Sequence, residues 1–375
     1  MSRRKKKWLI NGVRVTLCGA ALWVVAWGVV LDDHVLLVDG REVVGRIVDP
    51  GDPIVVLLAD GRHESIALAD VALDEEGEAR IELGLASALR DSRKGLLVWA
   101  LVLSLIVPFL LAQRLRLLLS AQGIRIGYVE SVKLSFAGNF LNFATPLGSN
   151  AGDVFKAYFV SLHTEHKTEA VTTVLLDRII GLASLLGVVA IMAVLSPSDS
   201  PLAGFRMYML GMIAAGIGAI VAYLSPTLRR TLVPIGLIER LPFIAQLKRV
   251  DKAVCNLVAH KGIVVAAVIT TVALQMIAIA AYFLVAIAIG LAAGVSNMME
   301  FYAYFATGSV VQALPGPPQG LGTVELTYCY FFAPFGSASQ IVCVALVIRV
   351  VVLAAALPGL FVTLTGSYKP KRALA

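Results

Sequence analysis

The chain has 375 residues, of which 58% are hydrophobic and only 15% charged, and its mean hydropathy is +0.83. Soluble globular domains carry about 25% charged residues, so this composition excludes an ordinary soluble enzyme or binding domain. The formal net charge is +7, but residues 32–94 hold fifteen acidic and seven basic residues, a net charge of −8, which leaves +15 for the rest. The basic residues, Arg114 among them, flank apolar blocks, which the positive-inside rule explains. We therefore expect no nucleic-acid partner.

The apolar residues gather in blocks of membrane-spanning length, since a helix needs about 20 residues to cross the hydrocarbon core. The clearest blocks are 9–31, 95–112, 170–195, 202–224, 262–290 and 338–365. We predict an all-α polytopic protein of the cytoplasmic (inner) membrane with six full spans and both termini in the cytoplasm. Residues 1–31 then hold the cytoplasmic N-terminus and first transmembrane helix, 95–366 form the transmembrane domain, and 367–375 form a cytoplasmic tail.

Residues 32–94 are the one hydrophilic stretch long enough to fold by itself, and their acidic charge places them outside the cytoplasm. The sequences VLLVDGREVVGRIV (35–48) and IVVLLADGRHESIAL (54–68) each set two β-branched apolar runs around Asp-Gly, which indicates a β-hairpin. The segment is therefore predicted to be a small extracytoplasmic β module. All four cysteines lie outside it, so we expect no disulfide framework.

Two apolar segments are interrupted in the middle by proline and glycine. The first, 131–163, breaks at Pro146 and at Gly148-Ser149-Asn150-Ala151-Gly152, and its arms of 15 and 13 residues are too short to cross the membrane separately. The second, 301–332, breaks at Pro315-Gly316-Pro317-Pro318 and at Gly320-Leu321-Gly322. We predict two re-entrant helical hairpins of opposite orientation, for about eight membrane segments in all, a pattern typical of inverted-repeat transporters. The longer arms of the second segment would also allow it to span fully.

Six ionisable residues are expected at membrane depth within the apolar blocks and the interrupted segments, where a charge is costly and usually functional. Asp177 and Arg178 are adjacent on one predicted helix and point in different directions, so each needs a partner on another element. Fixed ion pairs that only set helix register are the alternative to a role in binding. The three acids and three bases balance in charge, and they are Asp153, Lys156, Asp177, Arg178, Glu325 and Arg349.

The second arm of each hairpin begins a helix directly after glycine-rich backbone, and free N–H groups at such a helix start bind anions. A lipid phosphate would suit this position, with Lys156 and Arg178 as cationic partners. We expect Arg349 to bind the same phosphate, because it stands alone on its span and needs an anion from elsewhere. Asp153 and Glu325 are the other anions available to it, and as first-turn carboxylates they would either cap their helices or contact the substrate.

The sequences NFLNFATPLGSNAGDVFKAY (139–158), VTTVLLDRIIGL (171–182) and LPGPPQGLGTVEL (314–326), with the late Arg349, resemble the lysylphosphatidylglycerol synthase transmembrane-region family over about 113–366. The resemblance implies a multi-pass, flippase-like fold with re-entrant helices that moves phospholipid or polyprenyl-linked lipid. It does not imply the synthase activity, because the soluble aminoacyl-transferase domain would follow the last span and the chain ends at Ala375. The candidate lipid-binding residues are Asn139, Asn142, Pro146, Gly152, Asp153, Lys156, Asp177, Arg178, Gln312, Gly320, Gly322, Glu325 and Arg349.

The function predicted from the sequence is binding and translocation of a phospholipid or polyprenyl-linked lipid, without catalysis. One alternative is a membrane subunit of a lipid-modifying or lipid-linked glycosyl-transfer enzyme, but no nucleotide-binding fingerprint is present and we predict no catalytic residues and no cofactor. Another is an assembly partner whose 32–94 module binds an extracytoplasmic protein. His163 and His166, with Glu165 and Glu169, form a charged loop rather than a metal site, because they lack tight ligand spacing.

Overall fold

The computed structural model describes residues 32–49, 51–58, 60–73, 81–82, 84–144, 151–162, 164, 166–196, 200–224, 254, 256, 259–314 and 318–365. The predicted first span 9–31, Pro146 and the tail 367–375 lie outside these residues. The chain divides into two compact units. Unit 1 comprises Met1–Ala100, Tyr282–Val295 and Leu321–Val351, and unit 2 comprises Leu101–Ala281, Ser296–Gly320 and Val352–Ala375.

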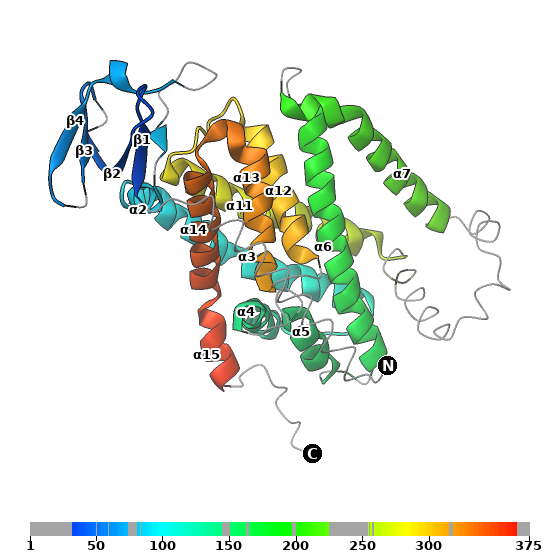
Figure 1. Ribbon diagram of the computed structural model, residues 1–375. Coiled ribbons are helices and arrows are strands. Elements are labelled where there is room, and N and C mark those ends of the chain that lie inside the picture. The colour runs from blue at the N-terminus through cyan, green and yellow to red at the C-terminus, as the bar shows by residue number, and fades with distance from the viewer. Residues whose placement is uncertain are drawn as a thin grey trace, which may run out of the picture. The chain divides into compact units, whose positions relative to one another are not determined.

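The N-terminal part of unit 1 is a five-stranded antiparallel sheet of order β4-β3-β2-β1-β5 (Figure 1). Both predicted hairpins are confirmed, since β1 pairs with β2 and β3 pairs with β4. The strands are β1 (Asp33–Leu36), β2 (Glu42–Asp49), β3 (Ile54–Leu57), β4 (His63–Ile66) and β5 (Ile81–Glu82), with a 3-10 turn η1 at Leu68–Asp70 after β4.

The Asp-Gly pairs make the turns of both hairpins in the same way. Gly40 and Gly61 have φ values of +83° and +85°, a left-handed conformation that glycine adopts without steric cost. The carboxylates of Asp39 and Asp60 each accept a hydrogen bond from the backbone N–H two residues later, at 2.8 and 3.0 Å. The local chemistry of the two turns therefore sets the strand pairing.

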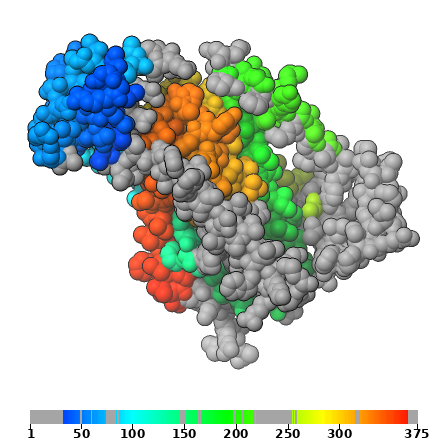
Figure 2. Space-filling view, in the orientation of Figure 1, coloured from blue at the N-terminus to red at the C-terminus, as the bar shows by residue number. Residues whose placement is uncertain are grey.

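One face of the sheet carries the core of this part, a cluster of apolar side chains that are almost wholly buried and that strand alternation brings to one side. Figure 2 shows the strands as a compact blue lobe. The residues of the cluster are Val35, Leu37, Val43, Ile54, Val56, Ile66 and Val71.

Asp33 ties this sheet to helix α2 (Leu85–Arg90) and is fully buried. Its carboxylate accepts hydrogen bonds from Ile47 N at 2.8 Å, Gly84 N at 2.7 Å and Ser87 Oγ at 2.9 Å. Burying a carboxylate is costly unless its oxygens are satisfied. The three donors meet that requirement and hold the start of α2 against the strands.

Four helices among the described residues are long and apolar enough to cross a membrane. They are α3 (Lys94–Ala121), α6 (Lys167–Leu195), α11 (Lys261–Ile289) and α14 (Ala338–Ala356), and each coincides with a predicted span. The predicted span 202–224 is a 3-10 turn η3 (Pro201–Phe205) followed by α7 (Arg206–Leu224). The protein is thus mostly helical with a small N-terminal sheet.

The last predicted span, 338–365, is not one continuous helix. It is divided into α14 and a shorter α15 (Pro358–Thr365), with Leu357 between them. Proline has no N–H to donate into the preceding turn and disfavours helical geometry in the residue before it. Pro358 therefore ends α14 and begins α15, where its missing N–H costs nothing.

Both interrupted segments break where proline and glycine predict. The first gives α4 (Tyr128–Ala144) and α5 (Ala151–Ser161). The second gives α12 (Met298–Ala313), a 3-10 turn η4 (Pro318–Gly320), and α13 (Thr323–Phe332), which η5 (Ala333–Phe335) extends. The remaining residues of each break lie outside the described ranges.

The helices of unit 2 pack closely around α4 and α6. Helix α12 lies along α6, while α4 packs against α5 and α15 (Figure 1). Gly359 of α15 permits the second contact, because a Cβ there would collide with the carbonyl of Phe136 on α4. Leu134 of α4 shares an apolar cluster with Leu119 of α3, Val160 of α5 and Val174 of α6. Four helices thus meet around α4 and fix its position within the unit.

Candidate functional site

Helices α4 and α5 form a tight antiparallel hairpin. The Asn142 Oδ1 atom accepts a hydrogen bond of 2.7 Å from Gly152 N, and Gly138 lies against both Gly152 and Lys156. A Cβ on Gly152 would collide with the carbonyl oxygen of Gly138, so the two backbones approach as closely as glycine allows. Positions earlier on α4 therefore meet later positions on α5, as a hairpin requires.

Lys156 lies inside this hairpin and is only 6% exposed. Its side chain crosses Gly138, and its Cε atom stands 2.8 Å from where a Cβ of residue 138 would be. Within the residues that the structure describes, no hydrogen bond or ion pair engages its ammonium group. A buried cation without a counter-charge is destabilising by several kcal/mol, on the order of magnitude found for broken buried pairs.

Arg178 joins the beginning of α5 to the end of α12. Its Nη1 is 3.3 Å from Asp153 Oδ2, and its Nη2 donates to the carbonyl oxygen of Ala313 at 3.2 Å. That carbonyl is one of the last in α12, where helix carbonyls lack partners within the helix and carry the negative end of the dipole. One guanidinium thus joins the two interrupted segments within unit 2, where α4 also contacts η4.

The second break has an unusual backbone. Gln319 has a φ of +55°, rare for a residue other than glycine, and Gly320 and Gly322 follow with +64° and +83°. Across the break, Gln312 Nε2 donates to Gln319 Oε1 at 2.8 Å. The predicted glycines Gly320 and Gly322 therefore serve a turn that only glycine accommodates readily, and Gln312 bonds across that turn.

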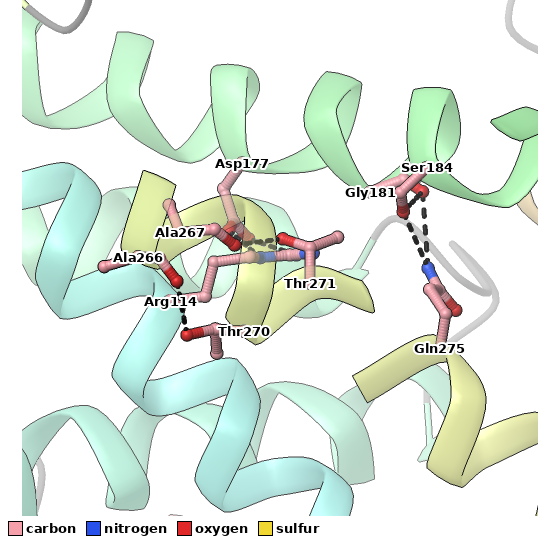
Figure 3. A network of polar contacts seen from close by, with 9 residues as sticks. All are labelled: Arg114, Asp177, Gly181, Ser184, Ala266, Ala267, Thr270, Thr271 and Gln275. Atoms are coloured by element: carbon pink, nitrogen blue, oxygen red, sulfur yellow. Dashed lines mark hydrogen bonds and ion pairs between the residues drawn. The ribbon is translucent and has the colours of Figure 1, made fainter. Parts of the chain in front are cut away.

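Asp177 is held by Arg114 of α3 in a closed, two-point ion pair (Figure 3). Arg114 Nε and Nη2 donate to the two carboxylate oxygens at 2.6 and 3.0 Å, and the side chains are 5% and 7% exposed. Gly181 leaves room for the guanidinium, since a Cβ there would stand 3.4 Å from Nη1. Nearby, Gln275 Nε2 of α11 donates to Gly181 O and Ser184 Oγ at 3.3 and 3.2 Å, which joins α11 to α6 (Figure 3).

Arg349 and Glu325 form a second ion pair, in unit 1. Arg349 Nε donates to Glu325 Oε1 at 2.7 Å, while Glu325 Oε2 accepts from Gly322 N at 2.7 Å and so caps α13. The sequence left Asp153, Glu325 or a lipid phosphate as the partner of Arg349, and we expected the phosphate. The structure places Glu325, one of these candidates, beside Arg349, and the carboxylate also caps its helix, one of the two roles expected of it. Binding of the phosphate by Arg349 stays a prediction.

The sequence reasoning missed two charged residues of unit 2. Arg114 was taken as a cytoplasmic flank of its span, because the residues around it are basic, whereas it is buried against Asp177. Glu300, in the first turn of α12, lies one position before the apolar segment 301–332, and it is buried with no hydrogen-bond partner for Oε2 among the described residues. Asn139 is half-buried on α4 near the site.

The described residues include an ion-pair partner for each of the three carboxylates that the sequence placed at membrane depth. Asp153, Asp177 and Glu325 each face an arginine, two of which the sequence identified, and the third is Arg114. Arg114 and Glu300, the two buried charges that the sequence reasoning missed, add one base and one acid, so acids and bases stay equal at four each. Lys156 and Glu300 are the two members of this set without an ion pair among the described residues.

These elements define a class of protein: a helical membrane protein with interrupted helices and with charged side chains inside its apolar segments. The chain belongs to the lysylphosphatidylglycerol synthase TM region family, which matches residues 84–359. The resemblance seen in the three sequence motifs is thereby confirmed. No curated protein and no solved structure is significantly similar to the chain.

Proposed function

We propose that this protein binds the anionic headgroup of a membrane lipid at Lys156 and moves that lipid between the two leaflets. The lipid class is a phospholipid or a polyprenyl-linked lipid. The protein changes the position of the lipid and not its covalent structure. The observation that carries the proposal is the burial of Lys156 without a counter-charge among the described residues, whereas Asp153, Asp177 and Glu325 are each matched by an arginine.

The surroundings of Lys156 suit a phosphate group. Helix α5 begins at Ala151, so Lys156 lies within two turns of the helix start, where the positive end of the dipole and the first-turn N–H groups other than that of Gly152 are found. The Oδ1 atom of Asn142 accepts a hydrogen bond from Gly152 N, so the amide Nδ2 remains as a hydrogen-bond donor at this hairpin. A phosphate oxygen would therefore meet an ammonium, a helix start and a side-chain amide.

The interrupted helices support movement of the lipid as well as binding. A break within an apolar segment exposes backbone polar groups, and at membrane depth such groups line a polar cavity or are buried in protein. We propose that α4–α5 and α12–α13 are re-entrant, that the protein lies in the cytoplasmic membrane with both termini inside, and that residues 32–94 lie outside. A headgroup passing the breaks would then stay in a polar environment while its tails remain in lipid.

The test is a reconstituted lipid-scrambling assay with fluorescent phospholipid in proteoliposomes. The Lys156→Gln variant should lose most of the transport seen with the wild-type protein, because the site loses its uncompensated charge. Lys167→Gln is the matched control, since Lys167 is exposed at the start of α6 and undergoes the same chemical change. Full transport by Lys156→Gln at normal abundance would overturn the proposal, as would an equal loss in both variants.

A further inference from the structure

In the part of the chain that the structure describes, three ion pairs involve the charged residues at membrane depth, and one of them differs from the others. Arg114–Asp177 has two contacts of 2.6 and 3.0 Å, and Arg349–Glu325 is held at 2.7 Å with Glu325 almost fully buried. Arg178 and Asp153 meet at 3.3 Å, with side chains 27% and 25% exposed. This pair is longer and partly solvated, so its members can exchange partners at low cost.

The exchangeable pair lies beside Lys156. Asp153 and Lys156 are three residues apart on α5 and therefore project from the same helix face, with Cβ atoms about 5–6 Å apart. An anion bound to Lys156 thus comes close to the carboxylate of Asp153 as well as to the guanidinium of Arg178. The three side chains together carry two positive charges and one negative charge.

From this geometry, and resting on the proposed function, we propose that Asp153 sets the charge of the headgroup that the site accepts. Because Asp153 pairs with Arg178, the three side chains carry a net charge of +1. A phosphodiester, which has a single negative charge, neutralises it. A phosphomonoester or a diphosphate brings at least one further negative charge and is repelled by the carboxylate of Asp153. Asp153 is therefore a specificity-determining residue, because its ion pair with Arg178 keeps that guanidinium from binding a second negative charge of the ligand.

The test uses calorimetry in detergent at pH 8 to compare the binding of two short-chain lipid probes. Dioctanoyl phosphatidylglycerol is a phosphodiester with one negative charge. Dioctanoyl phosphatidic acid is a monoester that is largely doubly charged at this pH, because its second pKa is about 6–7, near that of other phosphate monoesters. The wild-type protein should prefer the phosphodiester. Asp153→Asn should strengthen the binding of both probes, and the monoester should gain about fivefold more, since the repulsion removed scales with ligand charge.

Two variants control the comparison. Glu130→Gln removes a carboxylate from the third position of α4, as Asp153→Asn does from the third position of α5, and should leave the preference unchanged. The double variant Asp153→Asn, Arg178→Gln restores the net charge and should restore the wild-type preference, even where the single variant folds poorly. Thermal unfolding of each variant monitors folding.

The outcomes separate this inference from the proposed function. Weaker binding of both probes to Asp153→Asn, or an unchanged preference, would overturn the role of Asp153 and leave the role of Lys156 in place. Binding that Lys156→Gln leaves intact would refute the anion site itself. A preference that shifts in Asp153→Asn and returns in the double variant is the result expected.

Discussion

Replacing either member of the Arg114–Asp177 pair should strongly destabilise unit 2. The guanidinium and carboxylate centres stand about 4 Å apart, where two unit charges attract by about 4 kcal/mol at an effective dielectric constant of 20. Both side chains are nearly buried, so little water replaces a lost partner. Asp177→Asn and Arg114→Gln should each lower the free energy of unfolding by about 3–5 kcal/mol, the range for an orphaned buried charge.

The double variant Arg114→Gln, Asp177→Asn should recover most of this loss, because no uncompensated charge remains and the two amides can hydrogen-bond. The measurement is thermal unfolding in detergent combined with folded yield, analysed as a double-mutant cycle. If the double variant is as unstable as the sum of the singles, the two residues do not form the pair described. If Asp177→Asn loses less than about 1 kcal/mol, the site is solvated and the reasoning from burial is wrong.

Gly152→Ala should lower the stability by about 1–3 kcal/mol, because its methyl group would collide with the carbonyl of Gly138, and an unchanged melting temperature would show that the hairpin is open. Glu300→Met should raise the stability by about 1 kcal/mol, since it replaces a buried carboxylate oxygen that has no hydrogen-bond partner among the described residues with an apolar group of similar size. A loss of stability would reveal an interaction at Glu300. In intact cells, a cysteine at Asp60 should react with an impermeant maleimide and one at Lys167 should not, and the reverse pattern would invert the proposed orientation.

Elements whose cause lies within a few residues were predictable from the sequence. The Asp-Gly turns determined both hairpins because the glycine conformation and the aspartate hydrogen bond involve only neighbours. The four long apolar helices followed from length and composition, and the two interruptions followed from proline and glycine. Pro358 also indicates a helix boundary, but the uninterrupted apolar sequence around it led to the prediction of one continuous span.

Partnerships between distant residues were not predictable. Arg114 meets Asp177 63 residues later, and its basic neighbours made a membrane flank the simpler interpretation. Asp33 accepts hydrogen bonds from donors 51 and 54 residues away, which no local pattern reveals. The need for a partner could be inferred for Arg178 and Arg349, because a buried charge requires one, whereas the identity of each partner depended on how the helices pack.

The bond between Arg178 and Ala313 has a consequence for how the protein is made. The two residues are 135 positions apart, and synthesis at about 5–20 residues per second separates them by roughly 7 to 27 seconds. During that interval the nascent chain carries an arginine in an apolar segment with only half of its final contacts, since Asp153 precedes it and α12 has yet to emerge. Chains truncated before Ala313 should therefore be degraded by membrane quality-control proteases that recognise the unpaired arginine. Once α12 is complete, Arg178 can form its bond to Ala313 and the helices of unit 2 can pack together.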